Sequence, residues 1–139
     1  KMITKEQGLQ AIQEYLTENE IVEHTAIAHY KYENSLAGLA GIGSTYGVPV
    51  QGILVSTNSR LLFYGEVIKS IPVFVDIKYT DINRIEEKKM NYGLLKSIPA
   101  IIVSHKETET FTTQGNPDEF SKLKSFFELV KKKVASQQN

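Results

Sequence analysis

The side chains best suited to catalysis or metal binding in this sequence are its histidines. There are three, at His24, His29 and His105. Their spacing matches no metal-ligand pattern, and His24 and His29 face opposite ways if they lie on one strand. The sequence contains no cysteine, which excludes thiolate metal sites, thiol nucleophiles and disulfides. We therefore expect ordinary surface or core histidines, no metal site and no cofactor.

Two other patterns have a catalytic or phosphate-binding interpretation, and a structural explanation is simpler for both. No second acidic pair lies at a sequence spacing from Glu86-Glu87 that would indicate a shared site, so acid–base catalysis is not predicted. Gly41-x-Gly43, with Gly47, lacks the helix that must follow a phosphate-binding loop. No nucleophile–base pair emerges elsewhere. We predict that the chain is not an enzyme.

The glycine-rich stretch 33–49 is a candidate binding segment. It contains no lysine or arginine, and it intersperses large apolar side chains among its glycines. Such a segment either binds a partner that covers its apolar residues or folds back on its own sheet, and the sequence leaves both alternatives open. On the first alternative, the candidate residues for binding a protein partner are Leu39, Ile42 and Tyr46.

A basic neighbourhood is the second candidate site. Its members, called the basic set below, are Arg84, Lys88, Lys89 and Lys96. On a strand, Arg84 and Lys88 share one face and Lys89 lies on the other, while Glu86 dilutes their charge. A solvated face is the simpler interpretation. Weak binding to an anionic membrane surface is the alternative.

Composition limits the class of protein. The 139 residues and a hydrophobic fraction of 41% suit one domain with one core. Basic and acidic residues balance at 16 each, so a nucleic-acid partner is not predicted. No apolar run approaches the ~20 residues that cross a bilayer, and the N-terminus lacks the apolar core of a signal peptide. We expect a cytoplasmic protein.

The clearest strand pattern is the stretch Gly52 to Ile85. Here a polar turn joins two apolar runs, and a strictly alternating strand follows. The turn, Thr57-Asn58-Ser59-Arg60, predicts a hairpin whose side chains satisfy the backbone, with Arg60 either snorkelling to solvent or paired to an acid. Polar recognition by this turn is the less favoured alternative. In all, the patterns predict seven strands, at 21–32, 50–56, 60–66, 71–79, 81–90, 96–104 and 107–113.

Two helices are predicted, one at each end. Helix 116–134 has Asn116 as cap, Pro117 at its first position and one broad apolar face that must bury against the sheet, and residues 135–139 are expected to fray. Helix 4–17 begins with a capping box of Thr4 and Gln7. Its apolar stripe is narrow, so it packs either on the sheet or on a second copy in a homo-oligomer. We divide the chain into a helical extension, 1–19, and one domain, 20–139.

This layout resembles the bacterial, YokE-like branch of the pleckstrin-homology (PH) superfold. The resemblance is carried by GILVSTNSRLLFYGE at 52–66, by Tyr79-x-Asp81-Ile82, and by Ile101-Ile102-Val103, Thr110-Phe111-Thr112 and Asp118-Glu119-Phe120. It implies a mainly β (α+β) fold. The expected architecture is a seven-stranded antiparallel β-sandwich or barrel capped by a C-terminal α-helix, with an extra N-terminal helix.

The resemblance also bears on function. It implies a non-enzymatic binding or adaptor module, for which we favour a protein partner, with an anionic lipid surface as the alternative. PH domains that bind phosphoinositides use basic residues around the first loop between strands. That loop is 33–49 here, and only Lys31 stands at its entrance. Phosphoinositide recognition of the usual kind is therefore not predicted.

Overall fold

A computed structural model of the chain describes residues 4–31, 49–67, 71–91, 96–113 and 116–138. Along the chain, the strands lie between two α-helices, α1 at Lys5–Gln13 and α2 at Pro117–Gln137. A short 3₁₀ helix, η4, occupies Tyr79–Asp81. The seven strands are β1 Val22–Lys31, β2 Pro49–Thr57, β3 Arg60–Val67, β4 Ile71–Lys78, β5 Arg84–Asn91, β6 Ser97–Ser104 and β7 Thr108–Thr112. The predicted seven strands and two α-helices are confirmed, and η4 is an additional element.

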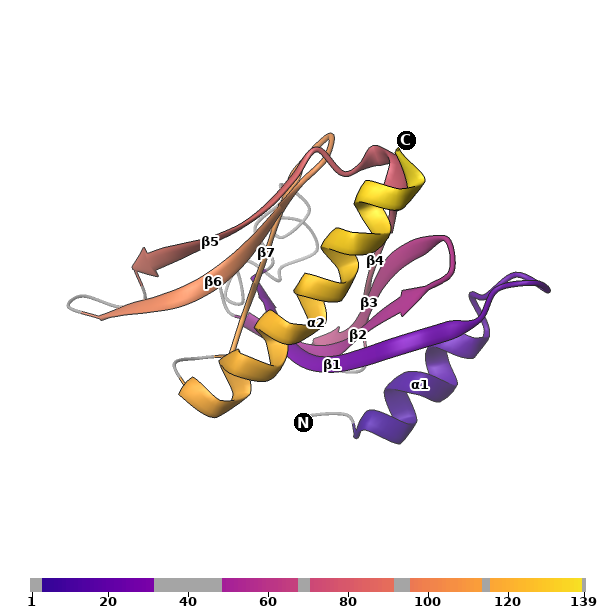
Figure 1. The fold of residues 1–139 in the computed structure, drawn as a ribbon. Helices are drawn as coiled ribbons and strands as arrows, with labels where there is room; N and C mark the ends of the chain where they lie inside the picture. The colour runs from indigo at the N-terminus through magenta and orange to yellow at the C-terminus, as the bar shows by residue number, and fades with distance from the viewer. Residues whose placement is uncertain (1–3, 32–48, 68–70, 92–95, 114–115, 139) are drawn as a thin grey trace.

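All seven strands belong to one antiparallel sheet with the order β4-β3-β2-β1-β7-β6-β5. The sheet curls into a half-barrel because β1 joins two groups of strands that diverge. β1 pairs with β2 along its length but with β7 only at His29 and Tyr30. Figure 1 shows β5, β6 and β7 on one side and β2, β3 and β4 on the other, with α2 lying across the opening.

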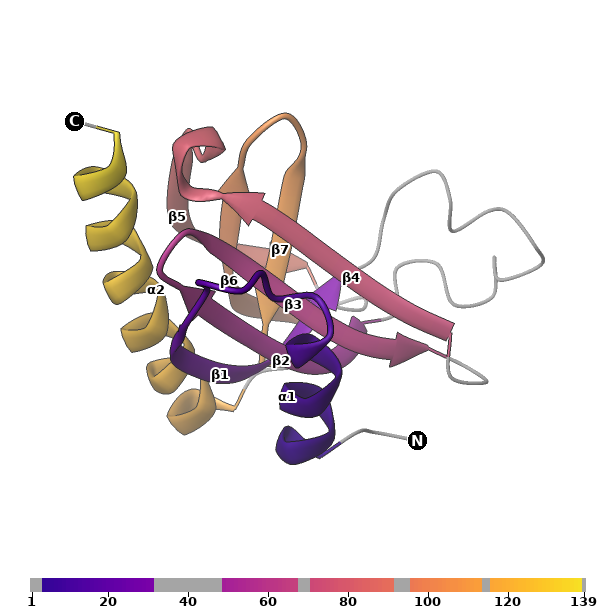
Figure 2. The ribbon, with the colours of Figure 1, turned by 90° about the vertical axis from the view of Figure 1, so that its right-hand side faces the viewer.

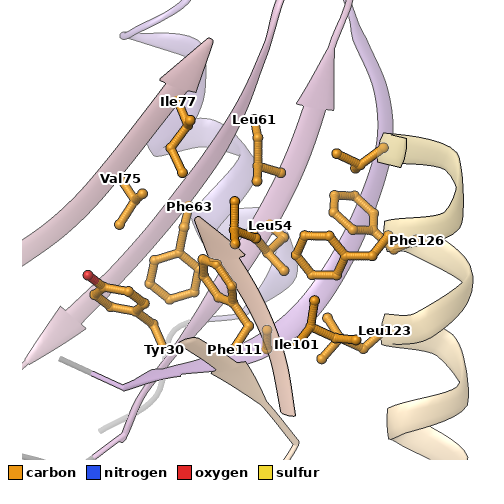
Figure 3. Close-up of a cluster of buried hydrophobic side chains, with 14 of the residues drawn as sticks. Tyr30, Leu54, Leu61, Phe63, Val75, Ile77, Ile101, Phe111, Leu123 and Phe126 are labelled. Atoms are coloured by element: carbon orange, nitrogen blue, oxygen red, sulfur yellow. The ribbon is translucent and has the colours of Figure 1, made fainter. Parts of the chain in front are cut away.

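The main core lies between the inner face of this sheet and α2. Alternate residues of the strands point inward, and Figure 3 shows the rings of Tyr30, Phe63 and Phe111 among them. The Phe127 ring of α2 lies against that of Phe111. α2 contributes the face predicted from its three- and four-residue spacing. The buried members of that face are Phe120, Leu123, Phe126, Phe127 and Val130.

Two glycines make room for one of these rings. Gly52 and Gly65 face each other across β2 and β3. A Cβ atom at Gly52 would lie 2.7 Å from Cζ of Phe63 and 2.1 Å from the carbonyl oxygen of Tyr64. Only a residue without a side chain allows the Phe63 ring to lie over this pair of strands, because the interior is close-packed.

α2 is longer than its apolar pattern predicts. The prediction that residues 135–139 fray is wrong for the helical residues, because α2 continues to Gln137. Side-chain amides hold the C-terminal end of α2. Gln138 Nε2 donates to the carbonyl oxygens of Tyr79, at 3.0 Å, and Ile82, at 2.7 Å. A polar contact thus extends the helix where no apolar residue signals it.

α1 packs on the outer face of the sheet, opposite the main core. Its capping box forms as predicted, with Thr4 Oγ1 accepting from the N–H of Gln7 and the Gln7 side chain accepting from the N–H of Thr4. Ile12 is fully buried in a second, smaller cluster on β2 and β3. The helix ends at Gln13 rather than Thr17. Beyond it, Arg60 binds the carbonyl oxygen of Tyr15 and Glu20 binds the N–H of Thr17, so these groups are lost to the helix.

The fifth strand also begins later than predicted. η4 turns the chain at Tyr79–Asp81, and β5 starts at Arg84 instead of Asp81. Tyr79 is fully buried and its hydroxyl donates to the carbonyl oxygen of Thr57 at 2.7 Å. This long-range contact holds the turn, which local alternation does not reveal.

Candidate functional site

The turn Thr57–Arg60 lies at the centre of an ion-pair network. Arg60 Nε donates to Glu20 Oε2 at 2.8 Å, and Nη2 donates to Glu20 Oε1 at 2.9 Å. Arg60 Nη1 donates to Asp76 Oδ2 at 2.8 Å. The Thr57 hydroxyl donates to Glu20 at 2.7 Å and accepts from two N–H groups of its own turn.

The charged groups of this network bind one another, so we interpret the network as a stabilising contact and not as a ligand site. The Glu20 side chain is 1% exposed and the Arg60 side chain 15% exposed. The hydrogen bonds from Arg60 hold the pKa of Glu20 at about 2, below its ordinary 4.5, although burial acts in the opposite direction. All three nitrogen atoms of the Arg60 guanidinium already donate to protein acceptors. Of the two alternatives predicted for Arg60, the structure shows pairing with an acid and not snorkelling.

The histidines lie apart from one another. His24 is exposed on β1, and His29 is half-buried on the same strand with Nδ1 lacking a hydrogen-bond partner among the described residues. Burial lowers the pKa of His29, which favours its neutral form. Within the described residues, no group of three or more His, Asp or Glu side chains is arranged to hold a metal ion.

His105 belongs to a buried polar cluster that the sequence did not reveal. Its Nε2 lies 2.7 Å from Glu109 Oε2, while the Tyr30 hydroxyl donates to Glu109 Oε1 at 2.5 Å. Glu109 is only 6% exposed. The cluster ties the β6–β7 turn to the end of β1. No local signal could have found it, because Tyr30 and Glu109 are 79 residues apart in sequence.

The basic set is dispersed and partly neutralised. Arg84 and Lys88 share the outer face of β5, where Arg84 Nε and Lys88 Nζ lie 3.2 and 3.8 Å from the same Glu86 carboxylate oxygen. Lys89 occupies the alternate position on β5, and Lys96 is exposed just before β6. The structure brings together only Arg84 and Lys88. The other candidates, Leu39, Ile42 and Tyr46, lie outside the described residues.

The sheet has two open edges. β4 hydrogen-bonds to β3 and β5 to β6, and among the described strands neither has a partner on its other side. Each edge offers a row of backbone N–H and C=O groups, the chemistry that an added strand uses. Pro72 on β4 and the charged residues of β5 make these edges selective, because they hinder indiscriminate pairing.

Comparison with known proteins identifies the family of this chain. The family model described as "GRAM domain" matches residues 8–134. The chain belongs to the GRAM domain family. The match includes most of α1 and nearly all of α2, so the family covers both helices as well as the sheet.

Two solved structures resemble this GRAM domain. The hSac2 domain from human phosphoinositide phosphatase Sac2 aligns with a TM-score of 0.65 at 14% identity, over 99% of this chain and 86% of that one. A DUF1696 family protein with a pleckstrin-homology domain, from Shewanella loihica PV-4, aligns with a TM-score of 0.46 at 9% identity, over 99% and 96% of the two chains. No curated protein matches the chain.

The fold is therefore the PH-like layout that the sequence predicts, with seven antiparallel strands, a capping α2 and the additional α1. Domains of the GRAM and PH-like class are generally non-catalytic and serve in binding. Among the described helices, none has the length and apolar character needed to span a bilayer.

Proposed function

We propose that this GRAM domain is a non-enzymatic adaptor that binds a protein partner. The observation that supports this most is the open half-barrel, whose β4 and β5 edges have no strand beyond them in the described part of the chain. A partner segment added to either edge would form backbone hydrogen bonds without reorganising the sheet. The Arg60 network and the α2 core keep the edges rigid, which lowers the entropy lost on binding.

An anionic membrane surface is the second candidate. Its support is the pair Arg84 and Lys88, which are 67% and 59% exposed on one face of β5. The shared contact with Glu86 reduces the net charge of this face, and the chain as a whole is neutral. Electrostatic attraction to a membrane scales with unneutralised basic residues, so we rank this function below protein binding.

Two measurements on the purified chain separate the two functions. The first is affinity capture from cells of the source organism, followed by titration of the purified captured protein at low and at physiological salt. The second is sedimentation with neutral and with anionic phospholipid vesicles. We expect a captured protein whose affinity changes little with salt, and no pelleting with either vesicle. Salt-sensitive pelleting with anionic vesicles, and no reproducible protein partner, would reverse the ranking.

We also propose a branch of the family and a cellular location for this chain. We assign the chain to the YokE-like branch and to the bacterial cytoplasm. The support for the location is the cysteine-free sequence, which suits a reducing compartment. The support for the branch is the residue pattern of the Thr57–Arg60 turn, followed by Tyr79-x-Asp81-Ile82. Both segments have structural roles here, in the Arg60 network and in η4, so a relative that keeps the pattern should keep the same contacts.

A further inference from the structure

A groove separates β1 from α2 on the surface of the half-barrel. It has a volume of about 390 Å³, and its apolar lining comes from Phe126 and Leu129 of α2. The polar side chains around it include Thr25 of β1 together with Ser121, Lys122 and Ser125 of α2. Figures 1 and 2 both show α2 beside β1, on the side of the strand away from α1.

The β1 wall of the groove is an unpaired strand edge. β1 pairs with β2 over Val22–Lys31, but with β7 only at His29 and Tyr30. Residues 22–28 therefore have no strand on their second edge in the described structure. No backbone hydrogen bond outside the regular elements involves these residues either, as far as the chain is described.

The two ends of this edge are closed by different contacts. At one end Lys133 Nζ of α2 forms an ion pair with Glu23 Oε1 at 2.8 Å. At the other end β7 begins to pair at His29. The open stretch between them, 24–28, spans roughly 16 Å at about 3.3 Å per residue. A short extended peptide matches that length.

The side chains that line the groove are free to bind. Within the described chain, the hydroxyls of Thr25, Ser121 and Ser125 make no hydrogen bond. Lys122 has only a surface ion pair with Glu119, at 3.6 Å, in which both side chains are largely exposed. Such pairs contribute little, so a ligand carboxylate can replace Glu119.

The charge of the groove selects the kind of ligand. Its lining carries a lysine and a histidine, Lys122 and His24, and no carboxylate. A bound acidic side chain would meet a cation and three hydroxyl donors, while a neighbouring apolar side chain would meet Phe126 and Leu129. A basic side chain would meet the like charge of Lys122 and no carboxylate of the lining.

We propose that the β1–α2 groove binds an extended, acidic peptide segment of a partner protein, which pairs with the backbone of β1 at 24–28. This inference rests on the proposed adaptor function and names the surface that performs it. The bound segment would add a strand to β1 rather than to β4 or β5, and it would place its acidic side chain against Lys122 and the two serines of α2.

The test uses two synthetic peptide libraries of about seven residues with blocked ends, long enough to span the open edge. One library fixes Asp or Glu at the central position and the other fixes Lys or Arg. Binding to the full chain is followed by enrichment, then by affinity of the selected peptides and by amide hydrogen exchange. We expect selected peptides from the acidic library only, and slowed exchange at 24–28.

Charge-reversal variants on α2 provide the matched comparison. Lys122→Glu should weaken binding of a selected acidic peptide by at least about tenfold, roughly 1.4 kcal/mol. Lys132→Glu makes the same charge change at an exposed position of α2 outside the groove lining, and should change binding less than about twofold. Unchanged thermal melting of both variants shows that they fold.

The outcomes separate the groove from the wider function. Equal losses in the two variants, enrichment of the basic library, or exchange protection on β4 or β5 would overturn the groove assignment while leaving protein binding in place. Failure of every peptide to bind would also overturn it. The adaptor function itself fails only if, in addition, capture yields no protein partner.

Discussion

Arg60 joins four parts of the chain through one guanidinium group. Its donors bind Glu20 in the segment before β1, Asp76 on β4 and the carbonyl oxygen of Tyr15 after α1, while its own backbone begins β3. A planar fork with several donors suits this role, and the single ammonium of a lysine does not. The residue therefore positions α1 on the sheet rather than serving as a recognition group.

Acid should weaken the contribution of this network to stability, although Glu20 keeps its charge to a lower pH than an ordinary glutamate does. Because the folded-state pKa of Glu20 is lowered to about 2 from 4.5, its contribution to stability is fully present above pH 4.5. That contribution is lost progressively as the pH falls from 4.5 toward 2. Glu20→Gln should reduce the free energy of unfolding at pH 7 by roughly 1–3 kcal/mol, because an amide replaces the charged acceptor of Arg60.

Chemical denaturation of both proteins across this pH range measures the effect. The difference between wild type and Glu20→Gln should shrink as the pH falls from 4.5 toward 2. A difference that stays constant with pH would show that Glu20 acts through packing and not through its charge.

At the scale of elements, α2 is held to the sheet by aromatic packing. Phe127 is 1% exposed, and its ring centroid lies 5.8 Å from that of Phe111 on β7 and 5.3 Å from that of Phe126. Burial of such a ring supplies more of the docking energy than helix propensity does.

Truncation of this ring should therefore be costly. Phe127→Ala should lower the free energy of unfolding by about 3–5 kcal/mol, measured by urea denaturation. Lys132→Ala on the exposed face of the same helix should change it by less than about 0.5 kcal/mol. A loss below about 1 kcal/mol for Phe127→Ala would mean that α2 is not docked as described.

α1 covers a separate apolar surface. Ile53, Val55 and Leu62 are fully buried on the outer face of β2 and β3, and Ile12 of α1 lies against them. The Tyr15 ring, just after the helix, stacks on Phe74 of β4 with centroids 4.1 Å apart. The main core on the other face of the sheet includes no residue of α1.

Removal of residues 1–13 should leave a folded domain that associates with itself. The deletion keeps the Glu20–Arg60 pair but exposes the apolar outer face, and such a patch favours self-association. Circular dichroism should retain the strand signal, while light scattering should show a higher mass than that of the intact chain. Loss of the strand signal would place α1 in the core of the fold and would contradict the division at residue 19.

For the whole molecule, the half-barrel combines neutral charge with open backbone edges. Protein binding through those edges should depend weakly on ionic strength, because backbone hydrogen bonds are not screened as surface charges are. The double variant Arg84→Glu, Lys88→Glu should therefore retain the captured partner, with a small loss of stability because its ion pairs are exposed.

Partner capture by the purified double variant, compared with wild type at two salt concentrations, checks this expectation. Loss of capture in the variant, together with strong weakening of wild-type binding at the higher salt, would transfer the binding function to the basic set.

The sequence by itself determined the number and type of the elements. Alternation at 71–79, the polar turn before Arg60 and the capped apolar stripe from Asn116 are local signals, and each one reflects a backbone geometry that neighbouring residues impose. For Arg60 the sequence left snorkelling and pairing with an acid as alternatives, and the structure decided for the acid pair. The order of seven strands and a capping helix then sufficed to predict the PH-like architecture.

Only the tertiary structure decided which distant groups meet. Glu20 lies 40 residues from Arg60, and Glu109 lies 79 residues from Tyr30, so neither pair leaves a local pattern. The end of α2 leaves no local pattern either, because Gln138 binds carbonyl oxygens that are distant in sequence. Nor does the groove beside β1. That groove exists because β1 pairs with β7 over two residues only, and the curl of the complete sheet sets the length of that pairing.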